Sequence, residues 1–419
     1  MAILIVSGIV SAQSEIPDSS STAEQLTELD QYLKLAAEHN PRLKASYQTY
    51  QAALEKAGYA GALDDPMLSF GHFFQEVETR VGPQKEKLSL RQSFPWFGTL
   101  GNRSNLAQSQ AAVVYEKYKA DLLELTFELK LNYFHLLNLQ QKEALLKDNE
   151  QLVDYWVGLI KTKYELGEKS HSDLLQAQIE LARVQDALLS LQSEIEPVKA
   201  KLRALVNSDK YDFGTNDSFE IERLKLNEAL LLDSFSLTNP NLARYDALIK
   251  ANRESLALAS KASYPNFSFG VDYTVTDESP MAGIEDNGKD PLMVSVGINL
   301  PLWFGKNNAK KREAQASLKS AEYAYEDLKN QLRANMVAEL AGFDNNQRKY
   351  KLYQDDIIPQ AQYNLELLFK SYQLGESTIF DLIRVERELL NYQTTLLDIK
   401  FNSLVTLAKV ELLSNHQIY

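Results

Sequence analysis

Few residues in this chain combine the types and spacing that chemistry at a site requires. The loop at 283–290 resembles a phosphate-binding loop, but Asp290 stands where a magnesium-binding Ser or Thr is needed. His171, Ser172 and Asp173 are not a triad, because adjacent residues cannot form the required chain of hydrogen bonds. Cysteine is absent, and the five histidines include no two close enough in sequence to act as a ligand pair. The sequence therefore predicts no enzyme, no cofactor and no metal site.

Charge and hydropathy restrict the class of protein further. The 419 residues carry 57 acidic and 44 basic side chains, and the net charge of −13 argues against binding to nucleic acid. No apolar stretch reaches the ~18–20 residues of a transmembrane helix. The longest apolar run, Ala2–Val10, precedes small residues at 11–13 and is typical of a secretory signal. We interpret residues 1–22 as a signal remnant with a flexible lead-in; the alternative is a misassigned start of the chain.

The chain repeats itself once. Asn40–Leu43 returns as Asn239–Leu242, and four further motifs return in the same order, which chance does not explain. These motifs begin at Ser69 and Ser268, Pro95 and Pro301, Tyr164 and Tyr372, and Asp173 and Asp381. We assign repeats to 23–207 and 226–414, with a mid-height linker at 208–225 and a C-terminal tail at 415–419.

Each repeat is predicted to hold the same elements in the same order: a first helix, two strands, a very long helix and a last helix. We expect first helices at 24–62 and 227–262, strands at 66–76, 87–94, 265–276 and 291–300, long helices at 103–165 and 308–373, and last helices at 171–206 and 378–413. We also expect the last helix of repeat one and the first helix of repeat two to add to one long helix. The C-terminal and N-terminal helices should add likewise.

The long helices carry a heptad pattern. One seven-residue ladder in repeat one consists of Ala111, Tyr118, Leu125, Leu139, Leu146, Val153 and Ile160. This pattern is typical of coiled coils. A helix of ~63 residues is ~95 Å long, far longer than the helices of an ordinary globular domain. On the helices alone, a plain cytosolic coiled coil remains the alternative; for the whole chain, the alternative function is that of a soluble periplasmic coiled-coil scaffold protein.

The strands favour a membrane protein. Apolar and small or polar residues alternate along both strands of repeat two, so one face is apolar and the other is suited to water. We predict that the apolar face contacts lipid through Phe267, Phe269, Val271, Val294, Val296 and Ile298. The alternative is a soluble sheet whose apolar face packs on helices. Because lipid forbids open sheet edges, four strands per chain must close with other copies. Three copies give twelve strands and leave a channel, whereas the eight strands of a dimer enclose only side chains.

The duplicated motifs identify a family. The Asn-Pro starts, the Pro-Trp-Phe-Gly exit at Pro95–Gly98 and the Tyr-x-x-Gly turns resemble the TolC family of outer-membrane efflux proteins over nearly the whole chain after residue 23. The resemblance implies a mainly α homotrimer with a twelve-stranded β-barrel in outer-membrane lipid and a periplasmic α-helical barrel of coiled-coil hairpins. It also implies partners, namely a periplasmic adaptor and an inner-membrane RND-type transporter. The form Ser93–Gly98 looks closest to the branch that exports heavy-metal cations.

Two turns between helices are candidate gate residues. Gly167 and Gly375 fit helix C-caps, and Asp173 and Asp381 fit the third helical position of capping boxes. The resemblance implies a second role, in which Asp173 and Tyr372 link neighbouring helices and keep the periplasmic mouth closed. We therefore place the periplasmic gate and tip at Tyr164, Gly167, Asp173, Tyr372, Gly375 and Asp381. Ser377 stands where the family often has a basic residue, which implies a weaker latch.

Overall fold

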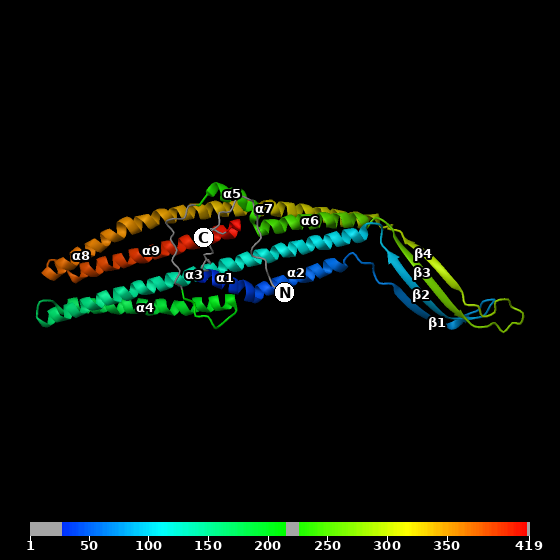
Figure 1. The fold of residues 1–419 in the computed structure, drawn as a ribbon, viewed down its shortest axis with the longest axis horizontal. Helices are drawn as coiled ribbons and strands as arrows, with labels where there is room; N and C mark the ends of the chain where they lie inside the picture. The colour runs from blue at the N-terminus through cyan, green and yellow to red at the C-terminus, as the bar shows by residue number, and fades with distance from the viewer. Residues whose placement is uncertain (1–26, 215–225, 417–419) are drawn as a thin grey trace, which may run out of the picture.

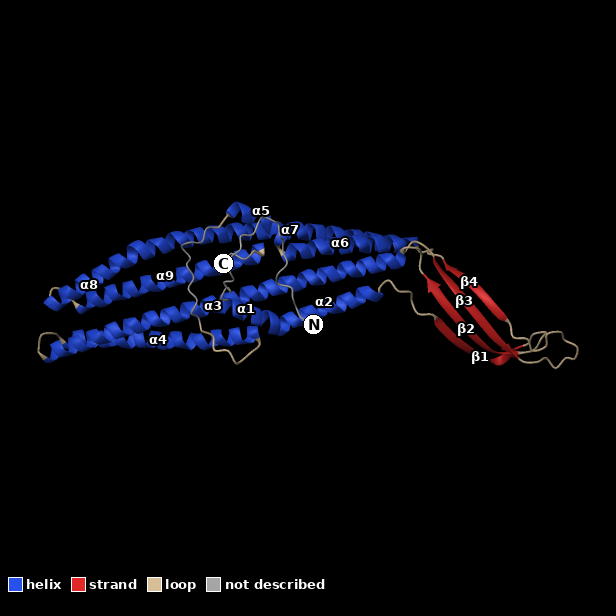
Figure 2. Ribbon diagram, in the orientation of Figure 1, coloured by secondary structure: helices blue, strands red, loops and turns tan. Residues whose placement is uncertain are grey.

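The computed structural model describes residues 27–214 and 226–416. The predicted signal segment at 1–22 lies outside these residues, as do parts of the predicted linker and tail. The described chain is a long rod of helices with a small sheet at one end (Figure 1). Figure 2, which is coloured by secondary structure, shows the strands beyond one end of the helices and the helical hairpins at the opposite end. The fold is thus mainly α with one four-stranded sheet.

The helices of repeat one are α1, α2, α3 and α4, and those of repeat two are α5, α6, α7, α8 and α9. Their bounds are α1 Glu28–His39, α2 Pro41–Tyr59, α3 Thr99–Glu165, α4 His171–Val206, α5 Glu228–Thr238, α6 Pro240–Lys261, α7 Phe304–Lys351, α8 Ile358–Leu374 and α9 Ile379–Ser414. A long helical stretch is present in each repeat, as predicted: α3 in repeat one, and α7 followed by α8 in repeat two. Each stretch ends in a predicted coiled-coil hairpin. The hairpins are α3 with α4 and α8 with α9.

The first helix of each repeat was predicted as one piece, and this is wrong. Asn40 and Asn239 each end one helix and cap the next, with proline at its first position. Each asparagine also donates from Nδ2 to a carbonyl at the end of its own repeat's last helix, Asn40 to Leu205 at 2.9 Å and Asn239 to Leu413 at 2.9 Å. The break exists because the side chain satisfies orphan backbone groups of two helices at once.

The same hydrogen bonds correct the expected pairing of helix ends. The end of α4 lies against the α1–α2 junction, and the end of α9 lies against the α5–α6 junction. Each last helix therefore meets the first helices of its own repeat, not those of the other repeat. Composition and length could not distinguish these pairings, because the two first helices are nearly equal in length.

The long helix of repeat two is not uniform. Between α7 and α8 the helix is π-helical over η2, Leu352–Ile357, and Pro359 follows at the start of α8. Proline lacks the N–H that an α-helical hydrogen bond needs, so the wider turn accommodates it. The stretch predicted as one helix at 308–373 thus has a weak point at the base of the α8–α9 hairpin.

The sheet is antiparallel, with strand order β1-β2-β3-β4. The strands are β1 Met67–Val77, β2 Gln84–Phe94, β3 Asn266–Thr276 and β4 Leu292–Asn299. The helices attached to them pack in the same order, α2 on α3, α3 on α6 and α6 on α7. The sheet is therefore a direct continuation of this four-helix layer.

Three buried clusters hold the rod together. The largest lies at mid-height, where Tyr133, Phe134 and Leu202 are nearly inaccessible. A second joins the two hairpins near their tips, and a third joins α5, α6, α7 and α9. Buried ion pairing accompanies the packing at mid-height, where Lys130 of α3 lies 2.5 Å from Glu411 of α9.

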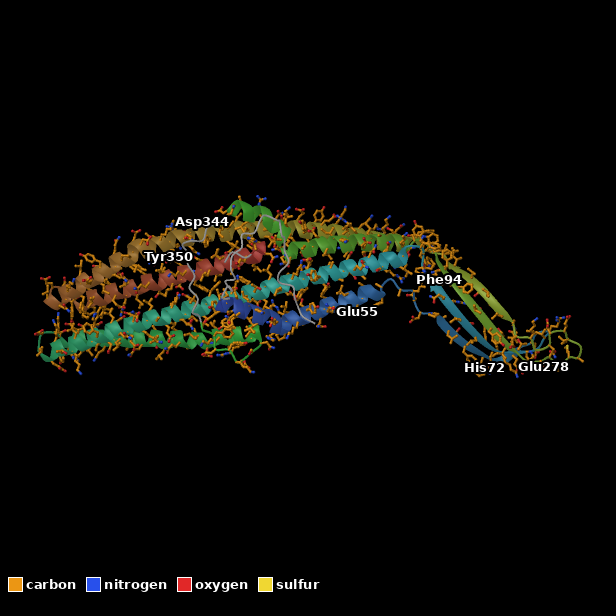
Figure 3. The ribbon with its side chains drawn as sticks, in the orientation of Figure 1. Glu55, His72, Phe94, Glu278, Asp344 and Tyr350 are labelled. Carbon is orange, nitrogen blue, oxygen red and sulfur yellow. The ribbon has the colours of Figure 1, made fainter. Side chains whose placement is uncertain are left out.

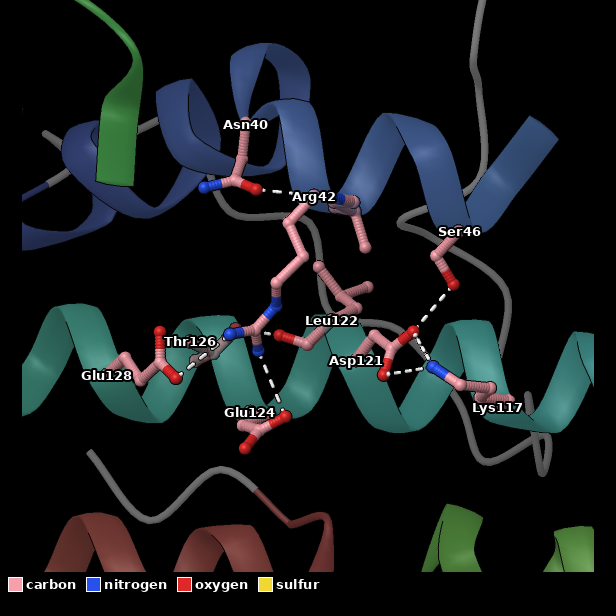
Figure 4. Close-up of polar contacts among 10 residues, drawn as sticks. Asn40, Arg42, Ser46, Lys117, Asp121, Leu122, Glu124, Thr126 and Glu128 are labelled. Atoms are coloured by element: carbon pink, nitrogen blue, oxygen red, sulfur yellow. Dashed lines mark hydrogen bonds and ion pairs between the residues drawn. The ribbon is translucent and has the colours of Figure 1, made fainter. Parts of the chain in front are cut away.

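Polar contacts between α2 and α3 are of a different kind. Arg42 donates to Glu124 at 3.0 Å and to Glu128 at 3.1 Å, and Ser46 donates to Asp121 at 2.6 Å (Figure 4). The Arg42 side chain is half exposed. Exposed ion pairs contribute little net stability. These contacts therefore set how α2 and α3 are aligned along each other, and they add little to the stability of the helix pair.

Candidate functional site

The strand register puts apolar side chains of all four strands on one face. Leu68, Leu90, Val271 and Val294 form one cross-strand row. The next row towards the loops consists of Phe70, Leu88, Tyr273 and Leu292. This face is open to the surroundings of the chain, since Val296 is 77% exposed and Phe70 is 66% exposed.

The six residues predicted to face lipid lie on this face, in three successive pairs across β3 and β4. Val271 pairs with Val294, Phe269 with Val296, and Phe267 with Ile298. No helix in the part of the chain that the structure describes covers this face, because the sheet extends beyond the helical rod (Figure 2). An uncovered apolar face of this size needs an apolar partner.

The opposite face is small and polar. Ser268 lies opposite Gly297, and Gly270 lies opposite Ser295. A Cβ on Gly270 would come within 2.7 Å of the Ser295 hydroxyl oxygen, so any larger residue there would force the Ser295 side chain to rotate away. Because Gly270 and Gly297 have no side chains, the hydroxyl groups of Ser268 and Ser295 are left uncovered on this face.

Charges on this polar face are mostly paired. Asp272 lies 3.1 Å from Lys87 and also accepts a hydrogen bond from Ser89. Arg91, one row away, is exposed and makes no ion pair or hydrogen bond among the described residues. Within the described residues, the polar face therefore carries a cation without a direct partner, Arg91, which acts on Asp272 only at longer range.

Aromatic rings collect where the sheet meets the helices. Trp96 stacks on Tyr264 with ring centroids 5.2 Å apart and on Phe267 at 5.7 Å. Figure 3 shows Phe94 at this end of the sheet and His72 towards the other end. Rings at the edge of an apolar band are typical of membrane interfaces.

The two tip turns share one backbone design. Gly167 and Gly375 adopt positive φ of 76° and 82°. In each turn the glycine N–H donates to the carbonyl three residues back and the next N–H donates to the carbonyl five back, which is a Schellman motif. A residue with a Cβ would be strained here.

The predicted capping boxes are confirmed. Asp173 exchanges hydrogen bonds with Ser170, and Asp381 exchanges hydrogen bonds with Thr378. The hydrogen bonds from Thr378 hold the pKa of the Asp381 carboxyl below its ordinary value. Both predicted gate aspartates therefore have a structural role at the start of their helices.

Tyr372 lies inside the chain rather than at its surface. It is 1% exposed, within the cluster that joins the hairpins, and its hydroxyl has no hydrogen-bond partner among the described residues. Burial, with a smaller contribution from the Asp173 charge, raises the pKa of Tyr372 to about 12. The Lys169 ammonium lies 4.0 Å from the centroid of the Tyr372 ring.

Tyr164, at the other turn, is exposed, and the centroid of its ring lies 5.3 Å from that of His171. The two turns thus approach each other, but no hydrogen bond joins Asp173 to Tyr372.

Sequence reasoning missed a polar joint between the hairpins. Glu180 of α4 accepts hydrogen bonds from Arg183 at 2.7 Å and from Nε of Arg387 in α9 at 2.8 Å. Glu386 of α9 accepts one from Asn149 of α3 at 2.6 Å. The signal was present, because each glutamate occupies a position in the apolar ladder of its helix where a hydrophobic residue is expected.

Two other kinds of site are absent from residues 27–214 and 226–416. No helix there is both long and apolar enough to cross a membrane. No group of three or more His, Cys, Asp or Glu side chains there could hold a metal ion.

These features define a class of protein: a helical rod with long hairpins, ending in a sheet with one uncovered apolar face. The family model for outer membrane efflux proteins matches residues 32–208 and 231–416, which is most of the chain. The chain belongs to the outer membrane efflux protein family.

Two curated relatives and a solved structure resemble the chain. The outer membrane efflux protein BepC of Brucella suis biovar 1 (strain 1330) is 18% identical over 314 residues, covering 74% of this chain and 67% of BepC. The outer membrane protein TolC of Escherichia coli (strain K12) is 20% identical over 415 residues, covering 92% and 81%. A structure of CusC superposes with a TM-score of 0.79 at 16% identity, covering 92% of each chain.

Family membership decides between the two functional alternatives. The chain is an outer-membrane efflux channel protein with a large periplasmic part, not a soluble scaffold. The relatives are efflux and outer-membrane proteins rather than enzymes. The CusC likeness, at 16% identity, concerns the fold alone.

Proposed function

We propose that three copies of this chain form a passive exit duct, and that the duct has no enzymatic activity. The observation that carries this proposal is the sheet with an apolar face and two edge strands, β1 and β4, that have no partner on their outer sides among the described residues. In lipid such edges must pair. Pairing β4 of one copy with β1 of the next closes a barrel of twelve strands, with the polar face inward.

Assembly tests the proposal directly. Detergent-extracted protein should have a mass about three times 47.5 kDa by light scattering, and it should conduct ions when inserted into a planar bilayer. A folded monomer with intact strands would contradict the shared barrel. A trimer without conductance would contradict the duct.

The helical rod supports a tripartite assembly. Its hairpin tips lie far from the sheet (Figure 1), so they project into the periplasm if the sheet lies in the outer membrane. We expect a periplasmic adaptor to contact these tips and an RND-type inner-membrane transporter to deliver the cargo. Crosslinking from a reactive group placed at exposed Leu166 or Leu374 should capture the adaptor, whereas the same group at exposed Tyr59, far from the tips, should not.

The tip turns are the proposed gate. Residues Tyr164, Gly167, Asp173, Tyr372, Gly375 and Asp381 would surround the mouth of a trimer, six turns in all. Asp173→Ala combined with Tyr372→Phe should raise single-channel conductance while the trimer persists. If the two residues act only in capping and packing, conductance should stay the same and only thermal stability should fall, by about 0.5–2 kcal/mol from the lost cap.

Heavy-metal cations are the proposed cargo. The support is the Ser93–Gly98 motif and the half-buried carboxylates of Asp173 and Asp381 at the tips, since carboxylate rings favour cations. Cells that lack this protein should accumulate copper or zinc, measured by mass spectrometry of washed cells. Unchanged metal content together with increased sensitivity to organic compounds would refute the metal cargo.

A further inference from the structure

A buried carboxyl group lies between the two hairpins without full hydrogen bonding. Glu386 of α9 is 2% exposed. Its Oε1 accepts a hydrogen bond from the Asn149 amide of α3 at 2.6 Å. Its Oε2 is buried and has no hydrogen-bond partner among the described residues. A charge held in this way is costly, because a buried carboxylate normally receives two or three donors.

The charges around Glu386 do not neutralise it. From α4, Glu180 is fully buried and carries a like charge, and it takes the hydrogen bonds of both nearby guanidinium groups, Arg183 of α4 and Arg387 of α9. From α3, Asn149 offers only a neutral amide. On α8, which packs on α9, the ionic residues Glu366 and Lys370 are exposed and pair with each other. The carboxylate that faces Glu386 is therefore Glu180, and the two nearby cations, Arg183 and Arg387, already donate to Glu180.

The joint lies at the boundary between the two hairpins. It connects the α3–α4 hairpin of repeat one to the α8–α9 hairpin of repeat two, just inside the tips. Within the described residues, the polar contacts that cross it near the tips are Asn149 to Glu386, Arg387 to Glu180, Lys163 Nζ to the Gln373 carbonyl at 3.3 Å, and the Lys169 ammonium over the Tyr372 ring. The α8–α9 arm also ends at the π-helical segment η2, a position at which helices bend.

We infer that Glu386 is a proton-controlled latch: its neutral form holds the hairpins together, and its ionised form favours their separation and the opening of the mouth. The opening of the mouth rests on the proposed function, whereas the separation of the hairpins can be measured on its own.

The direction of the effect follows from the shifted acidity. Burial, with a smaller contribution from the Glu180 charge, raises the pKa of Glu386 from 4.5 to about 7. An acid with a raised pKa stabilises the closed joint at low pH, and this stabilisation is lost as the pH rises from 4.5 through 7. If the separated joint restores the ordinary pKa, the ratio of open to closed joints rises about 30-fold between pH 5.5 and pH 8.5.

The test compares pH profiles of matched variants. Wild-type protein in a planar bilayer should open more often as the pH on the tip side is raised from 5.5 to 8.5. Glu386→Gln keeps the size and the acceptor for Asn149 but cannot ionise, so its opening should stay near the low-pH level throughout. Glu388→Gln removes an exposed carboxylate on the same helix, paired with Arg384 at 3.2 Å, and should keep the wild-type profile.

Hydrogen exchange gives a readout that needs no channel and no variant. After correction for intrinsic exchange rates, amides of α8 and the start of α9 should lose protection by about 30-fold between pH 5.5 and 8.5, whereas amides of mid-height α3 should not. Equal protection at both pH values would overturn the inference, and so would a pH profile of Glu386→Gln that equals the wild-type profile. If neither the wild type nor either variant conducts ions at any pH, the proposed duct is refuted. The hydrogen-exchange result would then be the only test of whether Glu386 controls the separation of the hairpins.

Discussion

Placing an arginine on the apolar face of the sheet tests where this face lies. Val294 stands in the row with Leu68, Leu90 and Val271 and is 59% exposed. It lies two rows above Ile298, about 13 Å along the strand. Ile298 is near the end of β4 that leads to the helices, so we take its level as one edge of the apolar band. With a strand tilt of ~40°, Val294 then lies about 10 Å below this edge, which is close to the middle of a band ~25 Å thick. Val294→Arg should therefore cost the full midplane penalty, about 2–4 kcal/mol.

The adjacent position supplies the control. Ser295 is the next residue on the same strand and points to the polar face. Ser295→Arg should cost much less, because its side chain reaches water in the proposed lumen. Both variants and the wild type would be unfolded by urea from lipid vesicles, with tryptophan fluorescence as the readout. Equal costs at the two positions would refute the assignment of lipid and water to the two faces.

The remaining predictions concern a buried ion pair, a cap and an unpaired cation. Lys130→Ala should lower the free energy of unfolding by about 3–5 kcal/mol, measured by denaturant unfolding, because it leaves Glu411 buried without its cation; a loss below ~1 kcal/mol would contradict this. Asn239→Ala should cost about 0.5–2 kcal/mol and increase hydrogen exchange at the end of α9, since it removes a cap and the bond to the Leu413 carbonyl; unchanged exchange there would be the contrary result. Arg91→Ser should shift the reversal potential of the channel in a salt gradient towards cation selectivity, because it removes an exposed cation that has no ion pair among the described residues; no shift would place Arg91 outside the lumen.

Periodicity predicted the elements better than their connections. The alternation of residues around Val271 predicted β3 within one residue at each end, since side chains in a strand alternate strictly. The Gly and Ser/Thr-x-x-Asp motifs predicted both tip turns, because capping depends on a few neighbouring residues. These features are local, so the sequence alone carries them.

Features that depend on distant residues were not predicted. The break at Asn40 forms because its amide reaches Leu205, which is 165 positions away. The burial of Glu180 and Glu386 depends on the way α4 and α9 face each other. A carboxylate in an apolar ladder is visible in the sequence, but its partner Asn149 comes from a third helix. The sequence therefore indicates that a polar joint exists without indicating which helices it joins.

The distribution of unsatisfied groups differs along the rod. At mid-height the buried Lys130 and Glu411 neutralise each other beside the largest apolar cluster, and one buried oxygen there, Oδ1 of Asn138, lacks a hydrogen-bond partner among the described residues. Near the tips two such oxygens occur, the Tyr372 hydroxyl in the cluster that joins the hairpins and Oε2 of Glu386, which carries a charge when ionised; both are buried without a hydrogen-bond partner among the described residues. Buried polar atoms without partners lower the stability of the region that contains them. Local opening should therefore begin at the tips while the mid-height cluster stays closed, which is the behaviour that a duct with a gate at one end requires.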